Sequence, residues 1–299
     1  MSIAVKELKE TLRRLDWIDQ LAEPLQKGVS AFYQKTGKLG SLLADFFNGT
    51  WLGHPLHPVI TDVPVGSWVA AVVLDQMESS TGRRGFGRSA DVAVAVGVAS
   101  AVSAAAAGLT DWQHLTGESR RTGFIHAALN TVALALFIGS MVSRKNKSRA
   151  MGRSLALAGL GVAGAGAYFG GDLVFRQKIG VNHAPDEINA PEFQPVYSAS
   201  DLPENQPTRA MLNTIPLVLV RQGEQIYALA EQCAHLGGPL ADGQLSVYEQ
   251  GSPHIICPWH GSTFEMSSGR VINGPSAYPQ PCFETRIFNG QVEVRLREK

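Results

Sequence analysis

Four residues with metal-binding side chains lie in two short boxes of similar composition. CAHLGGPL holds Cys233 and His235, and CPWHGSTF holds Cys257 and His260. Two irons bridged by sulfide can use such a set unequally, with thiolates on one iron and imidazoles on the other, which raises the reduction potential above that of an all-Cys cluster. The same side chains suit one tetrahedral zinc, although zinc ligands usually occur as C-x-x-C and H-x3–5-H pairs. We therefore expect a metal centre that moves electrons.

The two boxes resemble those of the Rieske 2Fe–2S family, in which C-x-H is followed by C-x-x-H with Gly-Pro-Leu and Cys-Pro-x-His-Gly surroundings. The resemblance covers residues 192–299. It implies a Rieske-type 2Fe–2S cluster and one-electron transfer between redox partner proteins. It also implies the ligands, which are Cys233, His235, Cys257 and His260.

Respiratory Rieske subunits add three features to these boxes: a disulfide between them, a Ser after the His-Gly, and a Tyr two residues later. Here the disulfide positions correspond to Gly238 and Trp259, so that bond is absent. Ser262 is present and is expected to contribute to cofactor binding, whereas Phe264 replaces the Tyr. The resemblance thus implies a potential below the respiratory type, within the family's range of roughly −150 to +300 mV.

Short apolar runs separated by turn residues surround the boxes. Asn289-Gly290 stands between two alternating runs and predicts a hairpin. The long gap between the boxes indicates a longer hairpin through residues 248–253. Together these runs predict a small all-β sandwich or barrel over residues 196–299. The third cysteine, Cys282, is expected to pack as a small buried hydrophobe. The predicted strands are residues 217–220, 226–229, 282–287 and 292–295.

Upstream, the chain holds four long stretches with few or no ionisable side chains. The third has only His126, and the first has Asp62 near its start and Asp75 near its end. About 20 apolar residues cross a bilayer core of roughly 30 Å. We therefore predict four transmembrane helices rather than a soluble bundle, with glycines in the fourth allowing close helix approach. The predicted spans are residues 56–77, 92–109, 123–142 and 154–171.

The expected fold class is multi-domain α and β, with an N-terminal four-helix transmembrane bundle and a C-terminal small all-β domain. Residues 1–50 have amphipathic helical spacing and are expected to lie on the membrane surface or cap the bundle. Their charge indicates no secretory signal peptide. The bundle is assigned to residues 51–175, a polar linker to 176–195, and the all-β domain to 196–299.

Charges between the spans predict the orientation of an integral protein of a bacterial inner membrane. Two loops carry eight Lys and Arg residues, whereas the opposite loop carries Arg120 and Arg121. The positive-inside rule places the eight-charge loops in the cytoplasm and the all-β domain outside, although the N-terminal segment is basic too. The eight residues are Arg83, Arg84, Arg88, Arg144, Lys145, Lys147, Arg149 and Arg153.

Histidines of the predicted bundle lie at one end of it, the end that bears the all-β domain. His54 and His57 precede the first span, Asp111 ends the second, and His126 begins the third. Ionisable groups in membranes are costly and usually functional. These four residues could form a second redox site, either a haem held by two neutral imidazoles or a quinone or quinol held by His and Asp. The other interpretation is plain interfacial polarity at helix ends.

Residues 50–175 resemble an uncharacterised bacterial four-helix membrane domain marked by an HPLHP-like motif. The resemblance rests on residues 54–68, 108–112 and 126–130. That family brings no activity, so the resemblance implies topology alone. It is also seen fused to Rieske domains, which is consistent with this chain.

Composition and motifs narrow the function. The 26 Lys and Arg residues balance 26 Asp and Glu residues, so nothing indicates a nucleic-acid partner. Only 39 residues, without a His, follow His260, which argues against an oxygenase with a 2-His-1-carboxylate iron. We favour a membrane-anchored one-electron carrier. The alternative is a membrane oxidoreductase whose helical domain binds quinol or haem and reduces the Rieske cluster.

Overall fold

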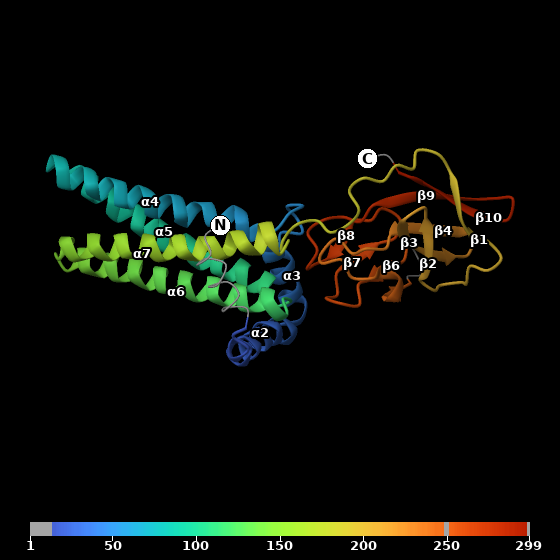
Figure 1. The fold of residues 1–299 in the computed structure, drawn as a ribbon, viewed down its shortest axis with the longest axis horizontal. Coiled ribbons are helices and arrows are strands. Elements are labelled where there is room, and N and C mark those ends of the chain that lie inside the picture. Colours follow the sequence, from blue (N-terminus) through green and yellow to red (C-terminus); the bar gives the residue numbers. More distant parts are fainter. Residues whose placement is uncertain (1–13, 248–250, 298–299) are drawn as a thin grey trace. The chain divides into compact units, whose positions relative to one another are not determined.

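The computed structural model describes residues 14–247 and 251–297, and the chain divides into two compact units (Figure 1). The first unit is helical, and the second is built on antiparallel sheets. This confirms the expected combination of an N-terminal helical bundle with a C-terminal all-β domain. The division is Met1–Gly40 with Leu56–Ile179 for the first unit, and Ser41–Pro55 with Gly180–Lys299 for the second.

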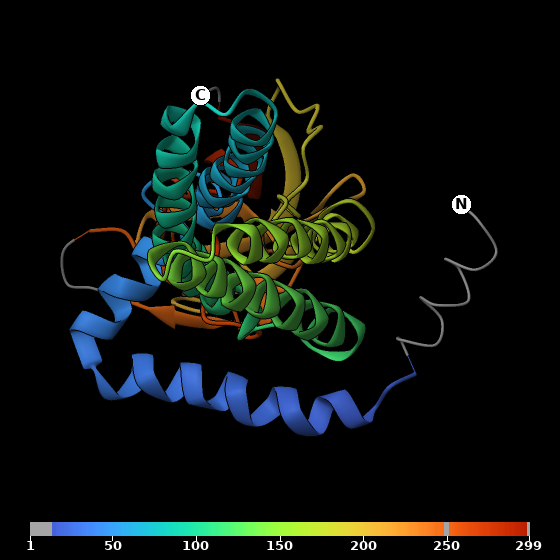
Figure 2. The same cartoon turned by 90° about the vertical axis from the view of Figure 1, so that its left-hand side faces the viewer.

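Four long helices make up the helical unit, and all four are long and apolar enough to cross a membrane. They confirm the four predicted stretches as helices. The first helix is longer than predicted only at its C-terminal end, the fourth only at its N-terminal end, and the second and third at both ends. The helices pair as two hairpins, which the end-on view of Figure 2 shows as two neighbouring pairs. Their bounds are α4 (Leu56–Thr81), α5 (Arg84–Trp112), α6 (Gly117–Lys145) and α7 (Arg149–Gly171), the last continued by a π-helical turn (Asp172–Arg176).

Two amphipathic helices precede the bundle, and the first of them packs on the turn between α5 and α6. The buried Gln26 amide donates to the Trp112 carbonyl at 2.8 Å. Asp19 pairs with Arg121 and Arg120, and these guanidinium groups hold the pKa of the Asp19 carboxyl below its usual value. Residues 1–13 of the predicted amphipathic segment lie outside the described residues. The two helices are α2 (Trp17–Lys35) and α3 (Gly37–Asn48).

Two aromatic rings stack at the centre of the bundle and bring the hairpins together. The Trp68 and Phe137 ring centroids lie 4.2 Å apart, with an angle of 7° between the planes. Each ring rests on a glycine of the adjacent helix. A Cβ on Gly97 would lie 2.3 Å from Trp68 Nε1, and one on Gly159 would lie 2.9 Å from Phe137 Cε2. Any side chain at either glycine would therefore displace the stack.

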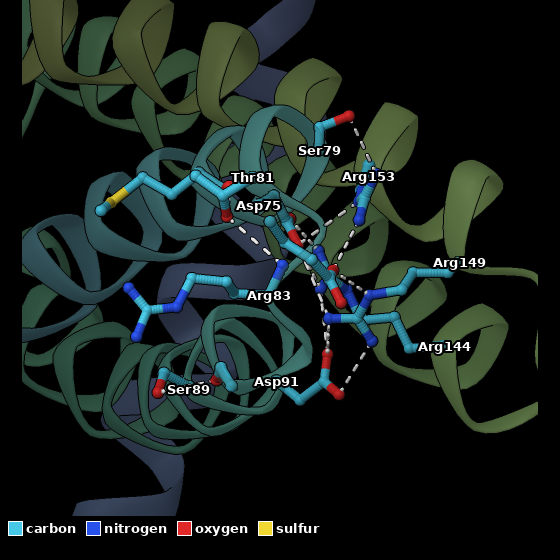
Figure 3. Close-up of polar contacts among 12 residues, drawn as sticks. Asp75, Ser79, Thr81, Arg83, Ser89, Asp91, Arg144, Arg149 and Arg153 are labelled. Atoms are coloured by element: carbon cyan, nitrogen blue, oxygen red, sulfur yellow. Dashed lines mark hydrogen bonds and ion pairs between the residues drawn. The ribbon is translucent and has the colours of Figure 1, made fainter.

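Three arginines from α6 and α7 meet three carboxylates from α4 and α5 (Figure 3). They lie at the end of the bundle where α4 turns into α5 and α6 turns into α7. Arg144 is buried; it binds both carboxylate oxygens of Asp75 and donates to Asp91 at 3.0 Å. Pairing lowers the cost of keeping these charges away from water. Three of the eight cations used to predict the orientation are thus neutralised within the bundle. The other members are Glu78, Arg149 and Arg153.

The β unit consists of a six-stranded and a four-stranded sheet, both antiparallel. The first has the order β1-β10-β9-β4-β3-β2, and the second β5-β6-β7-β8. Apolar residues of the sheets form two core clusters. The strands are β1 (Gln194–Ser198), β2 (Thr208–Leu212), β3 (Ile215–Gln222), β4 (Gln225–Ala230), β5 (Gln244–Ser246), β6 (His254–Ile256), β7 (Thr263–Glu265), β8 (Val271–Asn273), β9 (Cys282–Phe288) and β10 (Gln291–Leu296).

The four predicted strands correspond to β3, β4, β9 and β10. Asn289 and Gly290 join β9 to β10 with φ of 49° and 75°, the left-handed conformation that a two-residue hairpin turn of this type requires. The longer predicted hairpin is formed by β5 and β6, and residues 248–250 of its loop lie outside the described residues. Within the predicted linker, Ile188 and Ala190 pack into the core of the sheets.

We expect that replacing Arg144 by Met destabilises the bundle by about 3–5 kcal/mol, because Asp75 would be left buried without its cation. Thermal unfolding of the detergent-solubilised protein measures this. The matched control is Lys145→Met at the neighbouring exposed position, which should change stability by no more than about 0.5 kcal/mol. Equal stability of the two variants would contradict a structural role for the ion network.

Candidate metal centre

The first box forms a tight loop after β4, and this loop is closed around Cys233. The Cys233 N–H donates to the Gly238 carbonyl at 2.9 Å, and the Cys233 carbonyl accepts from the Gly237 N–H at 2.8 Å. Gly237 has a φ of 78°, which favours glycine. The glycines of the box are therefore needed for the loop to turn back on the cysteine.

The second box, between β6 and β7, repeats the same hydrogen bonds at the same spacing. The Cys257 N–H donates to the Ser262 carbonyl at 2.8 Å, and the Cys257 carbonyl accepts from the Gly261 N–H at 3.1 Å. Gly261 has a φ of 79°, nearly the value of Gly237. The two boxes are thus equivalent turns, each presenting one cysteine from its first residue.

The two loops bring their cysteine side chains together. The thiols of Cys233 and Cys257 hydrogen-bond to one another, and both side chains are buried. This contact lowers the pKa of Cys257 to about 6 against the opposing effect of burial, while the pKa of Cys233 is raised by the same contact. Backbone N–H groups support each sulfur: those of His235 and Leu236 donate to Cys233, and those of Trp259 and His260 donate to Cys257.

The two box histidines also meet. The His235 and His260 ring centroids lie 5.0 Å apart and nearly perpendicular, and both side chains are partly exposed. Burial lowers the pKa of His260, which favours the neutral imidazole that a metal ligand requires. Among the described residues, no three His, Cys, Asp or Glu side chains converge as for a single metal ion. One pair of cysteines and one pair of histidines suit two irons, one for each pair, better than one tetrahedral zinc.

The two positions assigned to the missing disulfide lie against one another. A Cβ on Gly238 would lie 2.9 Å from the Cys257 sulfur and 3.1 Å from the Trp259 ring. The indole of Trp259 is 56% exposed. Trp259 therefore occupies the space between the loops and leaves room only for glycine at position 238, while the three cysteines of the chain are free thiols.

A third loop, which follows β8, contacts the second box through Ser262. This serine is fully buried, and its Oγ accepts a hydrogen bond from the Ser276 N–H at 3.0 Å. The Gly274 N–H in the same loop donates to the Asp45 carboxylate at 2.7 Å. Burial raises the pKa of Asp45, and the hydrogen bond from Gly274 opposes this shift. Sequence reasoning missed Asp45 because it lies more than 200 residues upstream in an amphipathic helix.

Gln280 is a second supporting residue that the sequence did not reveal. Its side chain is 3% exposed and holds the backbone that leads into the first box. The Gln280 Nε2 donates to the carbonyls of Ala230 and Gln232 at 2.7 and 2.8 Å, and its Oε1 accepts from the Ala234 N–H at 2.9 Å. A glutamine between two prolines has no pattern that signals this role.

The remaining predicted residues divide between the two units. His57 and His126 lie in contact, with ring centroids 6.1 Å apart. Asp111 lies in the last turn of α5, three residues beyond Gly108, whose Cα faces the His57 ring. His54 belongs to the segment 41–55 of the β unit and is exposed. Phe264 and Cys282 are both buried in the core that also contains the cysteine pair. Burial was the expectation for Cys282.

We expect Gln280→Ala to weaken metal retention and to destabilise the β unit by about 1–3 kcal/mol or more, because buried backbone groups lose their hydrogen-bond partner. Iron content per chain and thermal unfolding provide the measurements. Gln291→Ala, at an exposed position of β10, is the matched control and should leave both unchanged. Full iron content in the Gln280 variant would show that the amide does not shape the loop.

Comparison with known proteins matches each unit to one family. Residues 192–284 match the Rieske [2Fe-2S] domain, and residues 53–183 match DUF2231, a predicted membrane protein. Ferredoxin CarAc of Metapseudomonas resinovorans is 30% identical over 105 residues, which cover 35% of this chain and 94% of the ferredoxin. Apoptosis-inducing factor 3 of Mus musculus is 28% identical over 126 residues, 39% of this chain, but the chain spans only 20% of that protein's length.

A solved complex of reduced oxygenase and oxidized ferredoxin in carbazole 1,9a-dioxygenase contains a chain that is 29% identical. The match covers 37% of this chain and 98% of that chain, with a TM-score of 0.32. The CarAc match spans nearly the whole ferredoxin, and the family match at residues 192–284 includes both boxes. The chain therefore belongs to the Rieske [2Fe-2S] family through residues 192–284, and joins this domain to a DUF2231 membrane domain at residues 53–183.

Proposed function

We propose that this protein is a membrane-anchored Rieske electron carrier, which passes one electron at a time between redox partner proteins. The observation that carries the proposal is the pairing of two equivalent loops, which join a thiol pair and an imidazole pair. Cys233 and Cys257 would hold one iron, and His235 and His260 the other. When bound, the 2Fe–2S cluster supplies reversible one-electron chemistry.

The chain's own groups would adjust that chemistry. The N–H groups that donate to the cysteine sulfurs stabilise negative charge, and therefore favour the reduced state. The Ser262 oxygen already accepts from Ser276, which leaves the Ser262 hydroxyl hydrogen available for a cluster sulfur. The partly exposed imidazoles, next to the exposed Trp259, form the edge at which a partner protein would dock.

Relatives indicate the class of partner. The CarAc relative is a ferredoxin, and a solved relative is found in a complex between an oxygenase and a ferredoxin. By analogy, the partners of this chain are soluble or membrane-bound redox enzymes. The four apolar helices indicate membrane localisation. We further propose the bacterial inner membrane, with the Rieske domain outside. The support is that Arg83 and Lys147 lie in the turns of the two hairpins, and that other basic residues lie in the adjoining helix ends.

A second function is favoured by the contact between His57 and His126. Their ring centroids lie 6.1 Å apart inside a domain of four long helices, whereas a single helix of about 20 residues would be enough to anchor a protein in a membrane. A membrane oxidoreductase would use this pair to bind haem or quinol and would deliver electrons to the Rieske cluster. The carrier remains the preferred function, because the cluster loops alone account for it and the respiratory disulfide and Tyr are absent.

The carrier proposal predicts that Cys257→Ser loses the cluster, because a hydroxyl is a far poorer iron ligand than a thiolate. Electron paramagnetic resonance of the reduced protein and the iron and sulfide content measure this, in membranes and after purification. Cys282→Ser is the matched control, since Cys282 is buried outside the loops and should leave two irons per chain. Zinc in place of iron in the wild type, or full iron in Cys257→Ser, would refute the proposal.

The cluster of the carrier should have a midpoint reduction potential in the lower part of the range of Rieske clusters. The Ser262→Ala substitution should lower this potential further. Loss of a hydrogen bond that favours the reduced cluster by about 1.4 kcal/mol corresponds to about 59 mV for one electron. Redox titration followed by circular dichroism or magnetic resonance provides the measurement. Ser268→Ala, at an exposed serine of the same unit, should leave the midpoint unchanged. A wild-type midpoint near the top of the range would contradict the ferredoxin-like assignment.

A further inference from the structure

His57 and His126 occupy equivalent positions in the two hairpins of the bundle. The Nδ1 atom of His57 on α4 lies 2.8 Å from the Ala104 carbonyl of α5. The Nδ1 atom of His126 on α6 lies 2.8 Å from the Gly166 carbonyl of α7. One turn further along the partner helix, each ring packs on a glycine. A Cβ on Gly108 would lie 2.9 Å from the His57 ring, and a Cβ on Gly170 would lie 3.0 Å from the His126 ring.

The equivalence extends along the whole length of the hairpins. The two histidines are 69 residues apart in the chain, and so are Trp68 and Phe137, and Asp75 and Arg144. The glycines that contact the aromatic and histidine rings are 62 residues apart in each case, one on α5 and the other on α7. They are Gly97 with Gly159, and Gly108 with Gly170. Each equivalent pair on α4 and α6 meets across the bundle, as histidines, stacked rings or an ion pair. The bundle is thus a two-fold repeat of one helical hairpin, with the histidines meeting where the two copies face each other.

The hydrogen bonds determine which nitrogen of each imidazole carries the hydrogen. A carbonyl oxygen only accepts, so each Nδ1 must carry it, and each Nε2 keeps a lone pair. The Asn130 amide nitrogen lies 3.4 Å from both nitrogens of His126 and donates to the His126 carbonyl at 2.9 Å, so this amide would turn aside when a metal binds. A hydrogen bond from Nδ1 to a backbone carbonyl is the arrangement that orients metal-ligating histidines. Two such imidazoles, supplied by a repeated hairpin, are therefore prepared as a pair of neutral nitrogen ligands.

The ring separation suits a single metal atom between the imidazoles. Two metal–nitrogen bonds of about 2.0–2.1 Å, plus about 1.1 Å from each nitrogen to its ring centre, place trans imidazole centroids about 6.3 Å apart. The observed separation is 6.1 Å, with ring planes 86° apart. A quinol bridging the two nitrogens would need roughly 11 Å between them, given two hydrogen bonds of about 2.7 Å and the length of its ring.

The number of ligands then selects the kind of metal site. Among the described residues, no third His, Cys, Asp or Glu joins the pair to complete a site for a bare ion, and zinc takes four ligands as a rule. Haem iron obtains four nitrogens from its macrocycle and needs only two axial ligands. The three cysteines form no C-x-x-C-H sequence, so a haem would not be attached covalently.

We propose that the DUF2231 domain binds one b-type haem through His57 and His126 as its two axial ligands. The site lies wholly within the helical unit and depends on neither the Rieske cluster nor its partners. The proposal takes two of the four residues expected from the sequence as the ligand pair. His54 is exposed, and Asp111 is three residues away from the glycine that the His57 ring contacts.

Purified full-length protein from cells supplied with iron and a haem precursor tests the proposal. The wild type should show a Soret band and about one haem b per chain in the pyridine haemochrome assay. His57→Ala and His126→Ala should each lower haem per chain at least tenfold. The control His54→Ala, three residues from His57 and exposed, should keep it. His57→Met should retain haem with a raised haem potential, because Met replaces one imidazole as axial ligand.

Cluster resonance recorded on the same samples separates this proposal from the carrier function. Loss of haem with an intact cluster signal and an unchanged gel-filtration profile assigns the effect to the haem site rather than to misfolding. If His57→Ala does not accumulate, haemin titration into the His126→Ala and His57→Met proteins decides. Wild-type protein that carries the cluster but takes up no haem, even from added haemin, would overturn the proposal. So would haem retained by the double alanine variant, or stoichiometric copper or zinc bound at the pair.

Discussion

Charge that is removed from water must meet a partner, and this constraint shapes both units of the chain. In the helical unit, Arg144 is buried near the end of the hairpins and is accompanied by Asp75 and Asp91. In the β unit, each buried cysteine sulfur accepts hydrogen bonds from backbone N–H groups of its own loop, which would stabilise a thiolate there. Both arrangements supply locally what bulk water would otherwise provide.

Repetition is the second organising feature, and it occurs at two scales. The bundle repeats a helical hairpin, so that residues on α4 meet their equivalents on α6 across the interior. The Rieske unit repeats a short turn, so that Cys233 and Cys257 meet in the same way. A repeated element that faces its copy brings two like side chains together at one place, which is the simplest route to a paired-ligand site.

Supporting residues outside the two boxes complete the metal centre. Gln280 holds the entry to the first loop, and the Gly274–Ser276 turn, itself bound by Asp45, supports Ser262 in the second. These contacts come from distant parts of the sequence, including a helical segment upstream of the bundle. The surroundings of a metal centre orient its ligands and tune its properties. One of these supporting residues, Asp45, lies outside the Rieske match at residues 192–284.

Much of this protein was determined by sequence alone, because local patterns carry it. Four largely apolar stretches are long enough to form spanning helices, Asn289-Gly290 predicts the hairpin turn, and the mixed Cys and His boxes predict the ligand set. Other features were decided only by tertiary structure: the hydrogen bonds of Gln280 and Asp45, and the proximity of the His57 and His126 rings. Contacts between residues far apart in the chain depend on packing, and no periodicity or spacing within one segment records which distant side chain will be its partner.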